Sequence, residues 1–162
     1  MVTRVEKFTD LEDEFNQYIR DIVYCSLITV DKKGRPRARV LLPIWELVDD
    51  RPVGWIAAYK TPVKTAHITN NPHVTCSYWN PRQNAVYADS VAEWVEDPTV
   101  KREVWDLYRK GSPSGVGYDP QHYWKGGPTD PEYGLLRMDP FRVQVLRGRD
   151  MRSRMWQPGD GS

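Results

Sequence analysis

Short runs of β-branched and aromatic residues, each followed by turn-forming residues, recur along most of the chain. Three of the gaps between runs read DKKG, DDRP and NPRQN, whose aspartate, asparagine, glycine and proline residues favour turns. Runs joined this tightly form hairpins, so the fold is expected to be mainly antiparallel β. The runs expected to form strands are residues 24–30, 35–45, 53–59, 73–79, 85–95, 133–138 and 141–146.

Three helices are expected among these strands. Apolar residues recur at helical spacing over residues 10–22, which predicts an amphipathic helix. A threonine–proline pair predicts the start of a short helix over residues 61–69, and an aspartate–proline pair does the same for residues 98–110. We expect the first and last helices to pack outside a small β-barrel, because closing the sheet removes its exposed edges.

The 162 residues suit one domain, which is expected over residues 1–146 with a basic C-terminal tail over residues 147–162. We interpret the arginine-rich tail as solvated. Residues 112–133 are rich in glycine, proline and aromatic residues, and a connection of that length is usually functional. The sequence contains no long apolar run and no apolar leader, which predicts a soluble, cytoplasmic protein with no membrane partner.

Charge and reactive residues argue against several function classes. The 23 basic and 22 acidic residues nearly balance, so no nucleic-acid partner is expected. Cys25 and Cys76 lack the spacing of a zinc or redox motif, and the three histidines are scattered, so no metal site is expected. No nucleophile motif is present either. An enzyme with this sequence would therefore rely on a cofactor for its chemistry.

Two lysines flank the start of the short helix, where partial positive charge from unpaired N–H groups disfavours cations. An anion bound by Lys60, Thr61 and Lys64 would resolve this conflict, and phosphate is the simplest candidate. Arg37 and Arg39 lie two apart on a predicted strand and share a face. Two interpretations remain open from these residues, an anion site or ordinary solvated lysines and edge-protecting arginines.

The order of three segments resembles a known family. LITVDKKGRPRARVLLPIWE, GWIAAYKTPVKTAHITNNPHVTCSYW and SVAEWVEDPTVKREVW together are similar to the pyridoxamine 5'-phosphate oxidase-like family of flavin-binding split β-barrels. The most specific parts are the RVLL strand and the K-x-x-x-I-x-x-N-P helix. The resemblance implies an antiparallel split β-barrel of six or seven strands, with peripheral helices. It also implies a homodimer that binds its cofactors at the subunit interface.

The resemblance also implies site residues. Arg39 would reach the phosphate side of the flavin and Lys64 would be the phosphate-binding lysine. The apolar residues of the RVLL strand would lie along the flavin, and two alanines would touch its ring or ribityl chain. The chemistry of the helix amino end adds Lys60 and Thr61 to this set. The full set of expected cofactor-binding residues is Arg39, Val40, Leu41, Leu42, Ala57, Ala58, Lys60, Thr61 and Lys64.

The expected function is an FMN-binding oxidoreductase that acts on a small molecule. Alternatives are a deazaflavin coenzyme-dependent reductase, a non-catalytic flavin-binding or sensor protein, and a barrel that binds phosphate or RNA. Some relatives bind haem, which is the least expected cofactor here. Pro43 replaces the lysine that follows this strand in pyridoxamine phosphate oxidases, and their later arginine–serine pair has no match. We therefore expect the small, general branch of the family, with substrate and catalytic residues unidentified.

Overall fold

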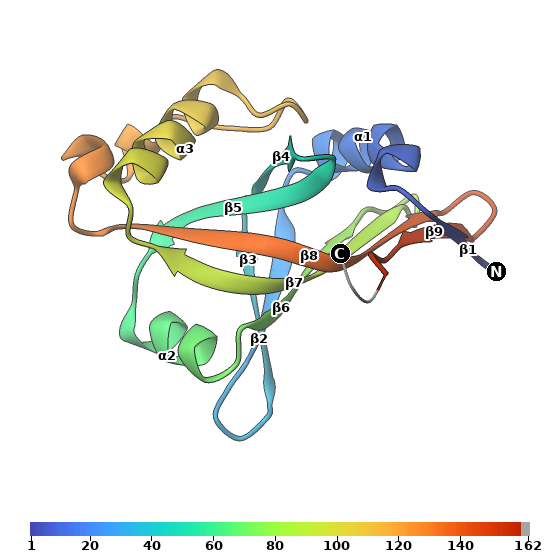
Figure 1. Cartoon of the computed structure of the whole chain (residues 1–162), viewed down its shortest axis with the longest axis horizontal. Coiled ribbons are helices and arrows are strands. Elements are labelled where there is room, and N and C mark those ends of the chain that lie inside the picture. The colour runs from blue at the N-terminus through green and yellow to red at the C-terminus, as the bar shows by residue number, and fades with distance from the viewer. Residues whose placement is uncertain (160–162) are drawn as a thin grey trace.

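Nine strands form one sheet in the computed structural model, which describes residues 1–159 (Figure 1). The strands are β1 (Val2–Val5), β2 (Cys25–Val30), β3 (Pro36–Leu41), β4 (Ile44–Val48), β5 (Arg51–Tyr59), β6 (His73–Trp79), β7 (Ala85–Val95), β8 (Tyr133–Arg147) and β9 (Arg152–Trp156). The helices are α1 (Glu12–Ile22), α2 (Pro62–Asn70) and α3 (Pro98–Lys110). Short 3-10 turns occupy Phe8–Asp10, Pro120–His122 and Gly127–Thr129.

The strand order is β1-β9-β8-β7-β6-β2-β3. Strand β5 pairs with β4 and with the first part of β8, on the edge of β8 that pairs with β9 further along. Every pairing is antiparallel except the parallel one between β1 and β9. The predicted mainly antiparallel split barrel is confirmed. The expected count of six or seven strands is wrong, partly because Leu42 and Pro43 divide the predicted strand 35–45 into β3 and β4.

Asp139 and Pro140 do not separate two strands, as the sequence suggested, but lie within the continuous strand β8. Asp89 of β7 pairs with Arg142 and Ser90 pairs with Pro140, so Phe141 is the extra residue of a β-bulge. On its other edge β8 pairs with β5 through residue 138 and with β9 from residue 143. The proline therefore falls between two partner strands, where its missing N–H removes no ladder hydrogen bond on that edge.

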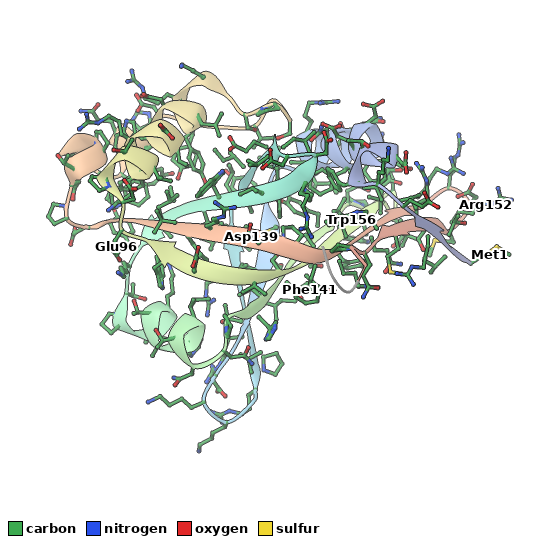
Figure 2. All side chains as sticks on the ribbon, viewed as in Figure 1. Met1, Glu96, Asp139, Phe141, Arg152 and Trp156 are labelled. Atoms are coloured by element: carbon green, nitrogen blue, oxygen red, sulfur yellow. The ribbon has the colours of Figure 1, made fainter. Side chains whose placement is uncertain are left out.

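The prediction of a solvated C-terminal tail is wrong for residues 152–156. These residues form β9, which pairs with both β8 and β1. Trp156 is only 4% exposed and its ring lies 5.7 Å from that of Phe8, edge to face. In Figure 2, Trp156 lies toward the middle of the molecule, whereas Arg152 lies near the tip of the β8–β9 hairpin. The last part of the predicted tail, residues 160–162, lies outside the described residues.

The three helices occupy the predicted regions. In Figure 1, α1 and α3 lie above β5, β8 and β7, and α2 lies below them. The start of α1 is later than predicted, because residues 8–10 form a separate 3-10 turn. Asp97 caps α3 by accepting hydrogen bonds from the N–H groups of Thr99 and Val100. No helix within residues 1–159 has the length and apolar character needed to cross a bilayer.

Strand β5 separates two apolar clusters. Ile56 and Ala58 face the barrel interior, which also holds the buried rings of Phe15, Trp45 and Tyr78. The alternate residues of β5 face α3 on the opposite side of the strand, among the side chains of a second cluster. That second cluster comprises Ile44, Val53, Trp55, Ala57, Val104, Trp105, Tyr108, Trp124, Tyr133 and Leu135. Both faces of β5 are therefore buried, which fixes the position of its carboxyl end.

Candidate functional site

Only two residues separate the end of β5 from the start of α2, so the strand sets the position of the helix amino end. Thr61 caps the helix, and its hydroxyl oxygen accepts a hydrogen bond of 3.3 Å from the N–H of Lys64. The first turn contains no acidic residue. The Lys64 side chain turns back toward the strand, where its Nζ donates to the carbonyl oxygen of Tyr59 at 3.2 Å.

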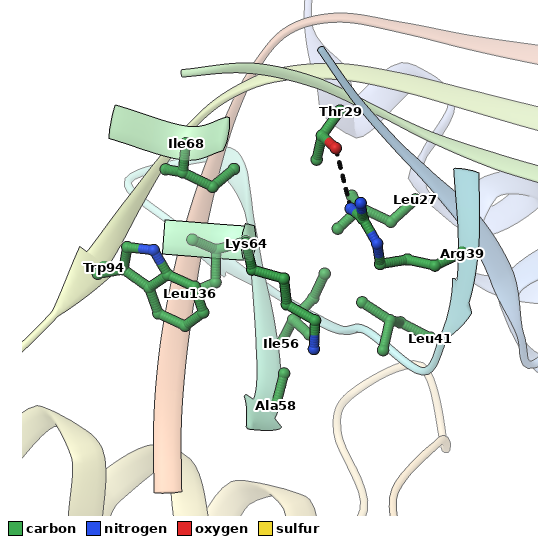
Figure 3. A pocket seen from close by; sticks show the side chains of 10 residues that line it. All are labelled: Leu27, Thr29, Arg39, Leu41, Ile56, Ala58, Lys64, Ile68, Trp94 and Leu136. Carbon is green, nitrogen blue, oxygen red and sulfur yellow. Dashed lines mark hydrogen bonds between the residues drawn. The ribbon is translucent and has the colours of Figure 1, made fainter. Parts of the chain in front are cut away.

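Arg39 of β3 and Lys64 of α2 point into the same space (Figure 3). Burial lowers the pKa of Lys64, and the nearby Arg39 charge lowers it further. Burial also lowers the pKa of Arg39, with a contribution from Arg37. Within residues 1–159 neither side chain has a carboxylate within 4 Å. Two partly buried cations without a counter-ion favour the binding of an anion between them.

Lys60 does not reach this space. Its ammonium forms an ion pair with Glu96 and lies 5.6 Å from the centre of the Trp94 ring. The acid that the helix start lacks in sequence is thus supplied from 36 residues further along the chain. Arg37 also lies apart from the site, where its Nε is 3.7 Å from Asp31. Of the two lysines at this helix start, only Lys64 lies beside Arg39.

A cleft of about 490 Å³ opens beside the two cations. This volume falls within the range of about 300–1,000 Å³ that is typical of small-molecule sites. The lining residues are Val23, Tyr24, Val40, Leu41, Leu42, Ala57, Ala58, Tyr59, Lys64, Gly117, Tyr118, Tyr123 and Trp124. They include six of the nine residues expected from the sequence. Arg39 lines an adjoining small cavity that shares Leu41, Ala58 and Lys64 with the cleft, whereas Lys60 and Thr61 line neither.

One wall of the cleft comes from residues that were not in the expected site set, although the segment that contains them was expected to be functional. It consists of Tyr118, Tyr123 and Trp124, which lie in the aromatic-rich segment 112–133. The rings form a contiguous series, with centroids 5.6 Å apart for Tyr118 and Tyr123 and 5.8 Å apart for Tyr123 and Trp124. The Tyr59 hydroxyl donates to the carbonyl oxygen of Tyr123 at 3.1 Å, which ties this wall to β5. The aromatic composition of the segment was the signal available in the sequence.

Tyr108 of α3 holds the cleft floor together. Its hydroxyl accepts a hydrogen bond of 3.1 Å from the N–H of Ala57 and donates to the carbonyl oxygen of Leu42 at 2.9 Å or of Trp55 at 3.1 Å. Burial raises the pKa of Tyr108 well above its usual value, so the hydroxyl stays neutral. One side chain thus connects β5, the link between β3 and β4, and α3.

A strained turn places Tyr24 at the cleft. Val23 has φ 72° and ψ −58°, and the N–H of Tyr24 donates to the carbonyl oxygen of Ile22 at 2.9 Å. This is a γ-turn, which is rare and unfavourable for a β-branched residue. Such strain tends to occur at functional sites, where the surrounding structure maintains it.

The chemistry of the lining suits a planar ligand with an anionic end. Arg39 and Lys64 supply donors for the anion. Apolar and small side chains from β3 and β5, together with the aromatic wall, would cover a ring system. No histidine, cysteine or methionine is among the lining residues, so tyrosine is the only common haem-iron ligand there. Within residues 1–159 no three His, Cys, Asp or Glu side chains gather as a metal site.

Comparisons with known proteins agree with this fold. The family model described as pyridoxamine 5'-phosphate oxidase matches residues 11–147. A Clostridium acetobutylicum structure, of a protein related to general stress protein 26 of B. subtilis, has a TM-score of 0.72 and 13% identity. That match covers 91% of this chain and 94% of the other. No curated protein matches in the corresponding sequence comparison.

Two further structures carry descriptions of a ligand. One is a pyridoxamine 5'-phosphate oxidase-related, FMN binding protein from Nostoc punctiforme, with a TM-score of 0.67, 16% identity and coverage of 93% of this chain and 92% of that one. The other is a heme binding protein from Mycobacterium smegmatis, with a TM-score of 0.59 and 16% identity, which matches 88% of this chain and 57% of its own. At these identities the likeness establishes the fold.

Replacing Tyr108 with phenylalanine is expected to destabilise the protein by about 1–3 kcal/mol, because the buried N–H of Ala57 loses its partner. Urea denaturation of both proteins measures the difference. Tyr59→Phe is the matched control, since its hydroxyl bond to Tyr123 is exposed and its loss should cost less than about 1 kcal/mol. Equal losses in the two variants would contradict the role given to Tyr108.

Proposed function

The chain belongs to the pyridoxamine 5'-phosphate oxidase family, and on that basis we propose that it is a flavin-binding oxidoreductase with FMN as its cofactor. One observation carries the proposal: Arg39 and Lys64 line one small cavity, with no acidic partner within residues 1–159, beside a cleft whose other lining residues are apolar or aromatic. Phosphate is the anion that such a pair suits, because the guanidinium offers parallel donors and the ammonium adds a point charge.

In this proposal Arg39 and Lys64 hold the phosphate. Leu41, Leu42 and Ala57, with Val40 and Ala58 beside them, contact the flavin, and FMN when bound supplies the electron and hydride chemistry. Thr61 acts indirectly, because it caps the helix that carries Lys64. Lys60 is given no phosphate contact, since its charge is already paired with Glu96.

The chain's own residues would bind the cofactor, orient it and exclude water from it. Lys64 is the only charged residue among those lining the cleft, which also include no carboxylate, histidine or thiol. Burial raises the pKa of Tyr118, so this residue serves as a neutral hydroxyl. A site with so few acids and bases is consistent with chemistry carried by a cofactor.

The same site can be compared with the needs of other cofactors. A deazaflavin coenzyme shares a planar ring and phosphate with FMN, so the two cations would serve it equally. Haem is suggested by the heme binding relative, but the cleft offers tyrosine alone among the common iron ligands. A flavin-binding protein without turnover would use the same residues as an enzyme and differs only in its kinetics.

We also propose a homodimer with the cofactor sites at the subunit interface. Tyr24, Val40 and Tyr123 all line the cleft, yet more than half of each side chain is exposed in the single chain. Apolar groups of this size gathered at one site are typical of a surface that another chain covers. A second copy would enclose the cleft and exclude water from a bound ring.

Lys64→Ala is expected to weaken FMN binding by roughly ten- to a hundredfold, because a charge-assisted contact of about 1.5–3 kcal/mol is lost. Arg39→Ala should weaken binding in the same direction. Titration of the apoprotein with FMN, followed by flavin fluorescence, measures both affinities. Lys60→Ala is the matched control, as it removes a lysine four residues away whose charge is paired with Glu96. Unchanged affinity in Lys64→Ala would contradict the assignment of the site.

The proposed oxidoreductase activity predicts repeated turnover. A reduced nicotinamide is expected to bleach the flavin absorbance of the reconstituted protein, and oxygen or a quinone should restore it over several cycles. Stopped-flow absorbance at the flavin band follows both halves of the cycle. Tight FMN binding without reduction would favour the non-catalytic protein. Tight binding of deazaflavin coenzyme in place of FMN would favour the reductase that uses it.

The proposed dimer predicts twice the chain mass by light scattering at micromolar concentration. Val40→Glu should shift the protein toward monomer, since it buries a charge in the apolar contact. Met151→Glu changes another exposed residue, at the β8–β9 turn far from the cleft, and should leave the mass unchanged. A monomeric wild type would overturn the proposed interface.

A further inference from the structure

A buried threonine lies behind Arg39. Thr29 of β2 is only 1% exposed, and its hydroxyl oxygen accepts a hydrogen bond of 2.9 Å from Nη1 of Arg39. Figure 3 shows this bond at the edge of the cavity that Lys64 also enters. The same oxygen lies 3.1 Å from Nδ1 of His67 on α2. Three elements of the barrel thus meet at one hydroxyl group.

One arrangement of donors and acceptors satisfies this buried hydroxyl fully when His67 is neutral. The guanidinium has no acceptor, so Thr29 must accept from Arg39. A second lone pair could accept from a protonated Nδ1 of His67, but the hydroxyl hydrogen would then have no partner among the hydrogen bonds described within residues 1–159. Directing that hydrogen to an unprotonated Nδ1 satisfies the buried group, and this arrangement puts the ring proton of neutral His67 on Nε2. His67 thereby fixes the direction of the hydroxyl and keeps its lone pairs toward Arg39.

The hydrogen-bond partner of Arg39, the Thr29 hydroxyl, is neutral and leaves the positive charge of Arg39 available to an anion. The acids of neighbouring strands and turns are engaged elsewhere, with Asp31 held by Arg35, Glu96 by Lys60, and Asp89 by Thr75 and Arg142. Thr29 is the only side-chain hydrogen-bond partner of Arg39 within residues 1–159. A carboxylate at this position would orient the guanidinium but cancel its charge. A hydroxyl orients it and leaves the charge available.

We propose that Thr29 and His67 are positioning residues that hold Arg39 ready for a phosphate, and so favour a phosphorylated ligand over the same ligand without phosphate. The proposal rests on the proposed flavin site. One N–H of the guanidinium is used by Thr29, and Nε and Nη2 remain for the anion. Fixing the arginine before binding removes part of the entropy loss that binding would otherwise incur.

Replacing Thr29 with valine keeps the shape of the side chain and removes its hydroxyl. We expect FMN binding to weaken about threefold to tenfold, as for the loss of one neutral hydrogen bond. Riboflavin, which lacks the phosphate, should bind Thr29→Val as it binds the wild type. Thr29→Ser restores the hydroxyl and should recover most of the FMN affinity. Fluorescence titrations with both ligands measure all of these affinities.

Thr75→Val is the matched control. Thr75 lies on the adjacent strand β6, and its hydroxyl donates to Asp89 at 2.7 Å, away from the site. The variant should lower the thermal melting temperature to a similar extent and leave FMN affinity unchanged. Equal FMN affinity in Thr29→Val and wild type would overturn the proposal. An equal weakening of FMN and riboflavin would do so as well, because it indicates general damage to the cleft.

A second measurement tests the positioning residues without any ligand. Nitrogen-15 NMR of the ligand-free protein should show neutral His67 protonated on Nε2, with Nδ1 as an acceptor. If the wild type binds neither FMN nor riboflavin, the proposed function fails and this spectrum decides the inference. A neutral ring protonated on Nδ1 contradicts it, whereas protonation on Nε2 supports it.

Discussion

The double burial of β5 is the constraint on which the site depends. One face of the strand packs into the barrel interior and the other packs beneath α3, so seven consecutive residues of β5 are buried. Tyr108 adds a hydrogen bond from α3 to the backbone of Ala57. The carboxyl end of the strand is thereby fixed between two packed layers. The fixed strand end determines the positions of Ala57 and Ala58 in the cleft floor. It also determines where α2 begins, and therefore where Lys64 lies.

The cleft combines this rigid apolar floor with charges that it does not neutralise. Partial burial makes the cationic forms of Arg39 and Lys64 less favourable, and the neighbouring charges of Arg37 and Arg39 add to the cost at Arg39 and Lys64, respectively. Elsewhere in the described chain, the partly buried arginines are paired, as Arg142 is with Asp89 and Arg154 with Glu14. This contrast supports the proposal that Arg39 and Lys64 bind a ligand.

Much of the fold was predictable from the sequence because its signals are local. Strands β6 and β7 and helix α3 occupy the predicted ranges, since their alternation, caps and turn residues lie within or next to each element. Two contacts near the site join residues that are 36 or more positions apart in the sequence. They are the ion pair of Lys60 with Glu96 and the hydrogen bond from the N–H of Ala57 to the Tyr108 hydroxyl. No local pattern encodes such contacts. Strand β8 was divided wrongly because the effect of Pro140 depends on its partner strands.

Several local departures from favourable chain chemistry lie around the cleft. Lys64 stands at the amino end of a helix, where the dipole disfavours it. Val23 adopts a positive φ that a β-branched residue resists, and Arg39 is partly buried with a neutral partner. Such unfavourable features tend to be retained where a ligand compensates for them. An anion beside Arg39 and Lys64 would offset the two charge penalties, and a ring against Tyr24 would make use of the strained turn. Three unrelated kinds of local cost, in charge, helix polarity and backbone geometry, therefore indicate the same site.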